Sequence, residues 1–428
     1  MTAKLTIFAL SSGAPPAGIA VIRVSGPAAF AAVTALAGTL PPARTARLRS
    51  LRDGTGALLD RALILRFPAP ASATGEDLVE LHCHGGRAVV AAVLAALGRQ
   101  PDVRPAQPGE FTRRALGNGR IDLAEARGLA DLLSAETERQ RVAAISAAEG
   151  VVSRQVRAWL TRLSALAARV EAQLDFADED DVAMDEAALI AVIDGMRALS
   201  DEWRSVIAEP PVERLRDGLL VVLAGPPNSG KSTLINLLSQ RDVAIVSDIA
   251  GTTRDRIEVP LVRDGLAYRL TDTAGLTDAA DPIERIGVTR AGKAIEEADI
   301  LLWLGDHAPP RADAIRVHAR ADQPGRVDMP AGRDVAVRQD QSATISVLWS
   351  IIHARAEALV PRIDAVSFRA QERGALQQAL AAIARPEDDP VLIAEQLRVA
   401  SRLLATILGI DATEAMLDAL FGQFCIGK

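Results

Sequence analysis

The residues most able to do chemistry lie near the middle of the chain, where Gly225 to Ser232 fit the pattern G-x-x-x-x-G-K-[S/T]. An apolar run at 219–224 precedes this stretch, and a helical pattern at 233–238 follows it. Glycines at such a strand-to-helix turn let backbone N–H groups surround phosphates, while Lys231 neutralises the outer phosphates and the Ser232 hydroxyl ligates Mg²⁺. The stretch therefore predicts a phosphate-binding loop (P-loop) for a nucleoside triphosphate rather than a chance glycine-rich turn.

A second landmark, Asp272-Thr-Ala-Gly275, follows an alternating strand pattern at 268–270. In a P-loop triphosphatase an aspartate here holds Mg²⁺ through water, and the glycine backbone senses the terminal phosphate. Residues 251–255 lie between the two landmarks, where a switch loop belongs, and offer a hydroxyl to the metal. We therefore expect nucleotide contacts from these residues: Asn228, Ser229, Gly230, Lys231, Ser232, Thr233, Gly251, Thr252, Thr253, Asp272, Thr273, Ala274 and Gly275.

The position after Gly275 carries Leu276. In Ras-like enzymes a glutamine at this position orients the attacking water, which a leucine cannot do. Either the domain barely hydrolyses its nucleotide, or another polar group positions the water. Glu284 is the nearest candidate for that catalytic role; the alternative is that it is a solvated helix carboxylate.

The base-reading positions depart from the usual pattern. Guanine recognition normally rests on Asn-Lys-x-Asp after a later strand, and here residues 315–318 lead into Ala319-Arg320-Ala321-Asp322. Asp322 can still accept from the guanine edge and the Arg320 stem can lie along the base, but the amide expected at Ala319 is missing. The loop near Val337 reads Arg338-Gln339-Asp340 instead of Ser-Ala-Lys. The sequence thus predicts a nucleoside triphosphatase and leaves its discrimination between GTP and ATP open.

Around this site, 428 residues predict two or three domains. Residues 1–119 mix strand patterns, at 18–24, 58–65 and 77–82, with turns, and the last of these strands ends at Gly85-Gly86. Residues 120–216 are helical, with one apolar face formed by Trp159, Leu160, Leu163, Leu166, Val170 and Leu174. Strand and helix patterns alternate over 217–362, and 363–428 are helical again. We therefore predict an α+β multi-domain chain in which a P-loop α/β domain is inserted into a discontinuous helical domain.

Composition excludes several other classes of protein. The net charge of −7 provides no global basic field for nucleic acid, and no stretch approaches the roughly 20 apolar residues of a membrane span. The N-terminus lacks the pattern of a secretion signal, so we expect a cytoplasmic protein that does not enter a membrane. Cys83 and Cys425 are then expected to be free thiols. His82-Cys83-His84 has no second Cys/His cluster to complete a zinc shell, so we expect a strand end there and no metal site.

Motifs outside the P-loop segment carry a family resemblance. They are Ala-Val-Ile-Arg-Val-Ser-Gly-Pro at 20–27, Thr-Gly-Glu-Asp at 74–77, Glu-Leu-His-Cys-His-Gly-Gly at 80–86, Pro-Gly-Glu-Phe-Thr at 108–112, Asn-Gly-Arg-Ile-Asp-Leu at 118–123 and Phe-Cys-Ile-Gly-Lys at 424–428. Together with the P-loop landmarks they resemble the MnmE (TrmE) family of tRNA-modifying GTPases over nearly the whole chain.

The resemblance implies an N-terminal folate-binding domain that dimerises (1–119), a helical domain in two halves (120–216 and 363–428) and an inserted Ras-like G domain (217–362). It also implies a homodimer that works on tRNA with a flavoprotein partner, MnmG (GidA), in a heterotetramer-type complex. The implied reaction adds an aminomethyl or carboxymethylaminomethyl group to C5 of the wobble uridine of certain tRNAs. A tetrahydrofolate derivative (5-formyl or 5,10-methylene) supplies the one-carbon unit, and hydrolysis of GTP needs Mg²⁺ and K⁺.

The resemblance also assigns residues, and it extends the expected nucleotide contacts to Ser247, Asp248, Ile249 and Ala250. Ser232 and Thr253 match the Mg²⁺ ligands, Asn228, Ser247, Ile249 and Thr252 match the K⁺ site, and Glu284 matches the residue that positions the catalytic water. Arg23, Glu80 and Lys428 match folate contacts, and Arg120 stands where the family has lysine. Cys425 matches a functional cysteine near the C-terminus.

A second hypothesis is a weakly hydrolysing, nucleotide-sensing scaffold on RNA or the ribosome. Leu276 and the altered base-reading loop at 319–322 motivate it. Hydrolysis rates in potassium and sodium salts separate the two hypotheses.

Overall fold

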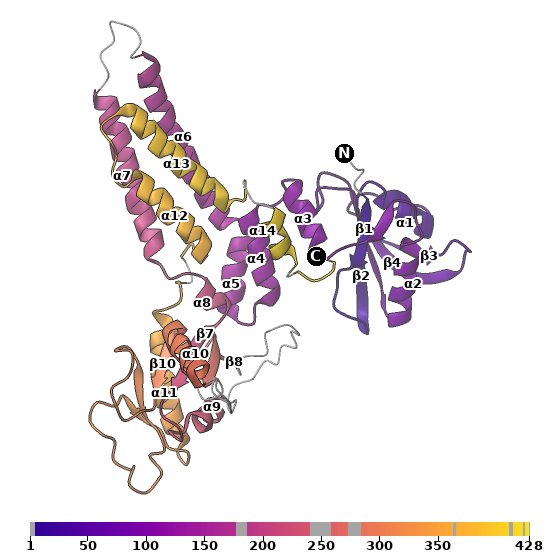
Figure 1. Ribbon diagram of the computed structural model, residues 1–428. Coiled ribbons are helices and arrows are strands. Elements are labelled where there is room, and N and C mark those ends of the chain that lie inside the picture. Colours follow the sequence, from indigo (N-terminus) through magenta and orange to yellow (C-terminus); the bar gives the residue numbers. More distant parts are fainter. Residues whose placement is uncertain are drawn as a thin grey trace. The chain divides into compact units, whose positions relative to one another are not determined.

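The structure is a computed structural model that describes residues 5–176, 186–239, 258–272, 284–362, 365–410, 414–422 and 424–427. The chain forms two compact units. The first comprises Met1–Ala130, Ala147–Arg157 and Leu404–Lys428, and the second comprises Asp131–Ser146 and Ala158–Leu403. Each unit contains one six-stranded sheet (Figure 1). The predicted α+β multi-domain class is confirmed.

The sheet of the first unit has the strand order β3-β4-β5-β2-β1-β6. Its strands are β1 (Thr6–Leu10), β2 (Ala17–Ser25), β3 (Arg47–Arg52), β4 (Leu58–Phe67), β5 (Leu78–Gly85) and β6 (Val103–Pro105). Neighbouring strands are antiparallel except β1 and β6, which are parallel. The strands predicted at 18–24, 58–65 and 77–82 are confirmed, and β5 ends at Gly85 as expected.

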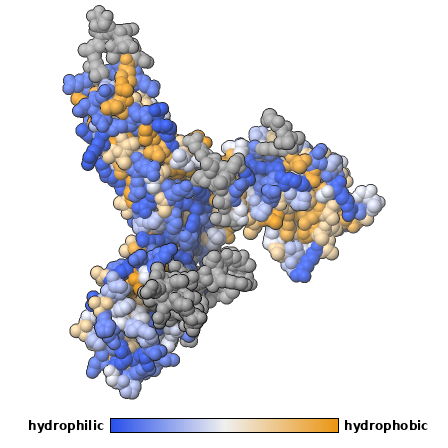
Figure 2. Space-filling view, in the orientation of Figure 1, coloured by the Kyte–Doolittle hydropathy of each residue, from blue (hydrophilic) through white to orange (hydrophobic). Residues whose placement is uncertain are grey.

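Helices α1 (Ala29–Ala37) and α2 (Arg87–Leu97) pack on this sheet through one shared hydrophobic core. Other apolar side chains of the same strands remain exposed: Ile19, Leu48, Leu58 and Leu63. Leu48 and Leu63 are direct partners in the register of β3 and β4. Figure 2 shows hydrophobic surface over this part of the chain. The sheet therefore has a covered core and, in addition, apolar surface that faces solvent.

The first unit also holds α3 (Glu110–Gly117), most of α4 (Leu123–Ser134) and α14 (Glu414–Phe421). The C-terminal tail is anchored by its backbone: Ile426 forms an antiparallel bridge with Pro108, and the Ser11 hydroxyl donates to the Gly427 carbonyl at 2.7 Å. Gly427 has φ +100°, and a Cβ there would lie 2.1 Å from the Leu10 carbonyl oxygen. Only glycine fits this contact, so the tail next to Cys425 has a defined position on the first sheet's unit.

Four long helices have most or all of their residues in the second unit: α6 (Val151–Phe176), α7 (Glu186–Ala208), α12 (Ala370–Ile383) and α13 (Pro390–Ile407) (Figure 1). Trp159, Leu163, Leu166 and Val170 on α6 are buried, as predicted, whereas Leu160 and Leu174 are half-buried. Trp159 stacks on Phe368 and meets Trp203 of α7 edge-on, with ring centroids 5.7 and 5.8 Å apart. The bundle is thus built from segments that precede the second sheet in the sequence and segments that follow it.

The second sheet has the order β12-β11-β10-β7-β9-β8. Its strands are β7 (Leu219–Ala224), β8 (Glu258–Arg263), β9 (Leu266–Asp272), β10 (Ile300–Trp303), β11 (Ile315–His318) and β12 (Val335–Ala336), and all are parallel except β8. Every residue of β7 is buried, as expected for a central parallel strand covered on both faces. β7 lies between β9 and β10, so the chain winds in opposite directions from it and its carboxyl end is the natural place for a ligand.

The remaining described helices are α5 (Glu138–Ala148), α8 (Glu213–Arg216), α9 (Lys231–Ser239), α10 (Glu284–Glu297) and α11 (Ser342–Glu357). The predicted alternation of strand and helix fails after β10, because the connections 304–314 and 319–334 contain no helix. Turn-forming residues explain this difference, since proline or glycine interrupts both segments at Pro309, Pro310, Pro324, Gly325 and Pro330. None of the described helices combines the length and apolarity needed to cross a membrane.

Candidate functional site

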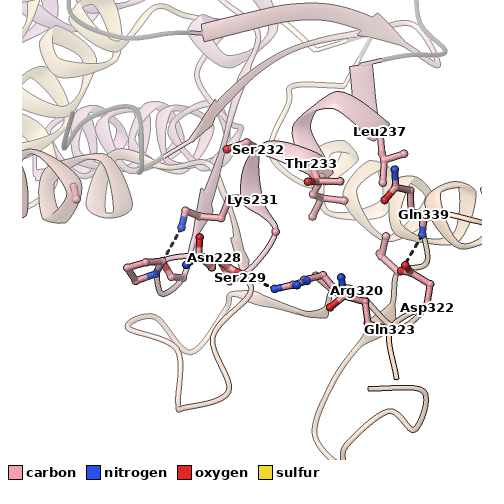
Figure 3. Close-up of a pocket in the computed structure, with 17 residues that line it drawn as sticks. Asn228, Ser229, Lys231, Ser232, Thr233, Leu237, Arg320, Asp322, Gln323 and Gln339 are labelled. Carbon is pink, nitrogen blue, oxygen red and sulfur yellow. Dashed lines mark hydrogen bonds between the residues drawn. The ribbon is translucent and has the colours of Figure 1, made fainter. Parts of the chain in front are cut away.

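A cavity of about 970 Å³ opens at the carboxyl end of β7 (Figure 3). One wall is the loop from Gly225 to Ser232 with the first turns of α9, and the other is formed by the loops that follow β11 and β12. Its lining residues are Gly225, Pro227, Asn228, Ser229, Gly230, Lys231, Ser232, Thr233, Leu234, Leu237, Ala291, Ala319, Arg320, Asp322, Gln323, Val337 and Gln339. The cavity therefore joins the predicted phosphate loop to the predicted base-reading segments.

The loop after β7 needs glycine at two points. Gly225 has φ +155°, and a Cβ there would lie 3.1 Å from the Ser229 hydroxyl oxygen and 3.2 Å from the Gly305 nitrogen. Gly230 has φ +97°, and Asn228 lies in the left-handed region at φ +59°, which asparagine tolerates better than most residues. These backbone angles close the tight loop whose N–H groups are suited to an anion at the start of α9.

Lys231 is the first residue of α9 and only 6% exposed. Its Nζ lies 3.0 Å from the carbonyl oxygens of both Gly225 and Pro226, so the side chain folds back across the loop. A buried ammonium group and the amino end of a helix then act at the same place. Their combined positive potential favours a phosphate chain in the cavity.

The structure brings together Ser232 and Asp272, two residues that the sequence assigned to Mg²⁺. The Ser232 hydroxyl donates to Asp272 Oδ2 at 2.9 Å. This contact exists because β9 pairs with β7, which sets the end of β9 beside the start of α9. A hydroxyl and a carboxylate are hard oxygen donors, the type that Mg²⁺ prefers, so the pair fits this ion.

At the other end of the cavity, Arg320 lies across the phosphate loop, with φ +62°, and its Nη1 donates to the Asn228 carbonyl at 2.8 Å. A Cβ on Gly230 would lie 3.3 Å from Arg320 Cγ, so the arginine stem packs on the loop. Asp322 Oδ1 accepts from the Gln339 backbone N–H at 3.3 Å (Figure 3). Arg320 thus links the two walls of the cavity, and Asp322 links the two loops of the base-reading end.

Sequence reasoning missed Arg326. Its Nε donates to the Ala319 carbonyl at 3.2 Å, and its own carbonyl lies 2.8 Å from Nε2 of the buried His318. The base-reading loop, which lacks an amide at position 319, is therefore held by an arginine seven residues later. No periodic pattern could have identified it, because residues 319–334 form no regular element.

Ser247, Asp248, Ile249, Ala250, Gly251, Thr252, Thr253, Thr273, Ala274, Gly275 and Lys428 lie outside the described residues. Glu284 begins α10, but its side chain also lies outside the description.

In the first unit, Arg23 on β2 and Glu80 on β5 are direct partners in the sheet register. Arg23 Nη2 donates to Glu80 Oε1 at 2.8 Å, and the guanidinium lies 5.8 Å from the centre of the Phe111 ring. Arg120 is exposed, and its Cγ would lie 3.0 Å from a Cβ on Gly75. Two of the four predicted folate contacts therefore form one half-buried ion pair, and a third, Arg120, packs on Gly75 in the turn at 74–77.

The His82-Cys83-His84 segment does not gather its side chains. His84 Nδ1 lies 2.7 Å from Asp60 Oδ1 and His82 Nε2 lies 3.4 Å from Glu80 Oε2, whereas Cys83 is buried in the core beneath α1 and α2. Alternation along β5 places Cys83 on the opposite face of the strand from the two histidines. The segment is a strand end with two paired histidines.

The two cysteines are free, as predicted, and differ in accessibility. Burial raises the pKa of the Cys83 thiol to about 12, and the Asp60 carboxylate adds to the shift; Cys425 is exposed. Because only thiolate reacts, we expect a disulfide reagent at pH 8 to label one thiol per folded chain quickly. Cys425→Ser should abolish this fast phase and Cys83→Ser should leave it intact. Two equal fast phases in the unmodified protein would contradict the burial of Cys83.

The sequence of the chain is similar to known proteins over its whole length. Residues 6–120 match the family model described as GTP-binding protein TrmE N-terminus, and residues 123–425 match the MnmE helical domain. A tRNA modification GTPase MnmE from Rhizorhabdus wittichii is 52% identical over 435 residues, covering 100% of this chain and 97% of the relative. Proteins of the same name from Erythrobacter litoralis and Zymomonas mobilis are 52% and 48% identical, each covering 99% of this chain and 100% of the relative.

Proposed function

The chain belongs to the MnmE family of tRNA modification GTPases, and from that premise we propose a potassium-dependent GTPase cycle that drives modification of wobble uridines. The protein is a GTPase that acts in tRNA modification. The finer proposal is that, with the flavoprotein MnmG, it adds an aminomethyl or carboxymethylaminomethyl group at C5 of the wobble uridine of certain tRNAs. The observation that carries the GTPase part is the cavity where the buried Lys231 and the Ser232–Asp272 pair converge.

The proposal assigns a task to the phosphate loop, Lys231, Ser232, Thr253, Asp272 and Glu284. The backbone of the phosphate loop and Lys231 bind and orient the triphosphate. This positioning lowers the activation free energy of hydrolysis, because the reacting groups are already held in place when the reaction begins. Ser232 and Thr253 would ligate Mg²⁺, with Asp272 holding the ion through water; when bound, the ion supplies positive charge to the phosphate oxygens. Glu284 positions the attacking water in place of the glutamine that Leu276 replaces.

A K⁺ ion would be held by Asn228, Ser247, Ile249 and Thr252. Of these, Asn228 is the residue with a described side chain, and it lines the cavity. Its backbone carbonyl is already engaged by Arg320, which leaves the side-chain amide oxygen as the ligand. When bound, such a cation supplies the charge stabilisation for which other GTPases use an arginine.

The folate part of the proposal rests on the Arg23–Glu80 pair. A carboxylate acceptor suits the donor edge of a pterin, and Arg23, Arg120 and Lys428 suit the carboxylates of a glutamyl tail. The tail that carries Cys425 is anchored to the same unit through Ile426 and Gly427, which supports a role for this cysteine in the modification reaction. The tetrahydrofolate derivative supplies the one-carbon unit, in its 5-formyl or 5,10-methylene form.

The exposed apolar residues of the first sheet, among them the paired Leu48 and Leu63, support a homodimer, because exposed apolar surface is often covered by a partner. The MnmG complex and the cytoplasmic location are proposed from family membership. The alternative, a weakly hydrolysing scaffold, is favoured by one observation: the base-reading loop lacks its amide and is held by Arg326 instead.

Hydrolysis of GTP in KCl and NaCl at equal ionic strength tests the proposal. We expect a rate at least about tenfold higher in KCl, because the cation contributes one charge-stabilising contact in the transition state. Asn228→Ala should remove most of the difference while the protein still binds GTP. Equal rates in the two salts would refute potassium dependence, and negligible hydrolysis in both with intact binding would favour the scaffold. Wobble uridines should be hypomodified in a deletion strain.

A further inference from the structure

The base-reading end of the cavity leaves one hydrogen bond unassigned. Guanine presents adjacent donors at N1 and N2 and an acceptor at O6, whereas adenine presents an acceptor at N1 and a donor at N6. Asp322 Oδ1 is occupied by the Gln339 N–H, and Oδ2 has no hydrogen-bond partner among the described residues. The carboxylate can therefore accept from the donors of guanine, but O6 still needs a donor.

The backbone N–H groups at 337–339, in the loop after β12, are already engaged. The Val337 N–H donates to the His318 carbonyl at 2.9 Å, the Arg338 N–H donates to the Thr344 hydroxyl at 3.1 Å, and the Gln339 N–H donates to Asp322. On the facing loop, position 319 is alanine and has no side-chain amide. All three backbone donors at 337–339 are thus used inside the protein.

The side chain of Gln339 is a polar group of this loop that lines the cavity. Gln339 is exposed and lines the cavity, and no described residue is hydrogen-bonded to its side-chain amide. Figure 3 shows Gln339 among the side chains that line the cavity. Building on the proposed GTPase function, we propose that the Gln339 side-chain amide donates to O6 of the bound guanine and replaces the donor missing at position 319.

This assignment divides the work of base recognition between two residues. A glutamine amide can donate to O6 or, after turning over, accept from N6 of adenine, so Gln339 supports purine binding in general. Asp322 then carries the discrimination, because its carboxylate faces the N1 acceptor of adenine without a donor between them. Changing Gln339 to a group that only accepts or only donates converts it into a discriminating residue.

The test measures affinities of the full-length protein for non-hydrolysable GTP and ATP analogues by calorimetry. Gln339→Glu, an acceptor only, should lower the ratio of GTP to ATP affinity by about tenfold, since a carboxylate opposes O6 and accepts from N6. Gln339→Lys, a donor only, should keep this ratio or raise it. The ratio is the readout because an added charge changes the attraction of both triphosphates equally.

Gln323→Glu is the matched control, since Gln323 lines the same cavity and the substitution adds the same charge. It should lower both affinities and leave their ratio within about twofold. An unchanged ratio in both Gln339 variants, or a larger change from Gln323→Glu, would overturn the assignment of Gln339 while the GTPase proposal stands. Absence of guanine nucleotide binding by the unmodified protein would instead refute the GTPase proposal itself.

Discussion

Lys231→Ala is expected to lower kcat/KM for GTP by about 10²–10³-fold. The Nζ of Lys231 is buried and lies 3.0 Å from two loop carbonyls, so it is held at the mouth of the phosphate cradle before any ligand binds. Each charge-assisted hydrogen bond to a phosphate contributes about 1.5–3 kcal/mol, and one ammonium group can make two of them. Two bonds at the lower end of this range, about 3–4 kcal/mol together, correspond to the stated loss in rate. Steady-state hydrolysis with excess Mg²⁺ measures it.

Two further substitutions make this prediction specific. Lys231→Arg should fail to restore activity, because a planar fork of five donors does not fit where a compact ammonium lies between two carbonyls. The chain has lysine at only four positions: Lys4, Lys231, Lys293 and Lys428. A lysine at 231 in a chain with so few lysines agrees with a need for an ammonium group at this position. Lys293→Ala is the control, since Lys293 is exposed on α10 and pairs with Glu297 at 3.5 Å. Full activity in Lys231→Arg would mean that charge alone, without this geometry, is sufficient.

The phosphate end of the site could be predicted from sequence because its determinants are local. The apolar run of β7, the glycines at 225 and 230 and the first residues of α9 follow one another directly, so pattern and structure coincide. The proximity of Ser232 and Asp272 could also be predicted, because the strand before the P-loop and the strand that ends in this aspartate are neighbours in this fold.

The base-reading end could not be predicted in the same way. Its geometry depends on Arg320 reaching Asn228 and on Arg326 reaching Ala319, and both contacts form across irregular chain without periodicity. Likewise, the docking of Gly427 against Leu10 joins residues at opposite ends of the chain. Sequence patterns report which face of an element is buried, whereas such contacts depend on the tertiary arrangement that brings distant segments together.

The junction between the two halves of the helical bundle depends on a small aromatic cluster. Trp159 of α6, Trp203 of α7 and Phe368 before α12 are each no more than 2% exposed. Trp159 contacts both other rings, and its Nε1 donates to Glu202 Oε1 at 2.7 Å. Phe368 follows the inserted sheet in sequence and the two tryptophans precede it. The cluster therefore joins the part of the bundle that precedes the second sheet in sequence to the part that follows it.

Trp159→Ala is expected to lower the free energy of unfolding of the bundle by about 3–5 kcal/mol, through the cavity it leaves and the loss of both ring contacts. Guanidinium denaturation followed by far-UV circular dichroism measures the change. Trp159→Phe should cost less, because it keeps a ring against Phe368 and loses the bond to Glu202. GTP binding without denaturant should persist in both variants, since the second sheet has its own hydrophobic core. Equal stability of Trp159→Ala and the unmodified protein would show that the two halves of the bundle are held together elsewhere.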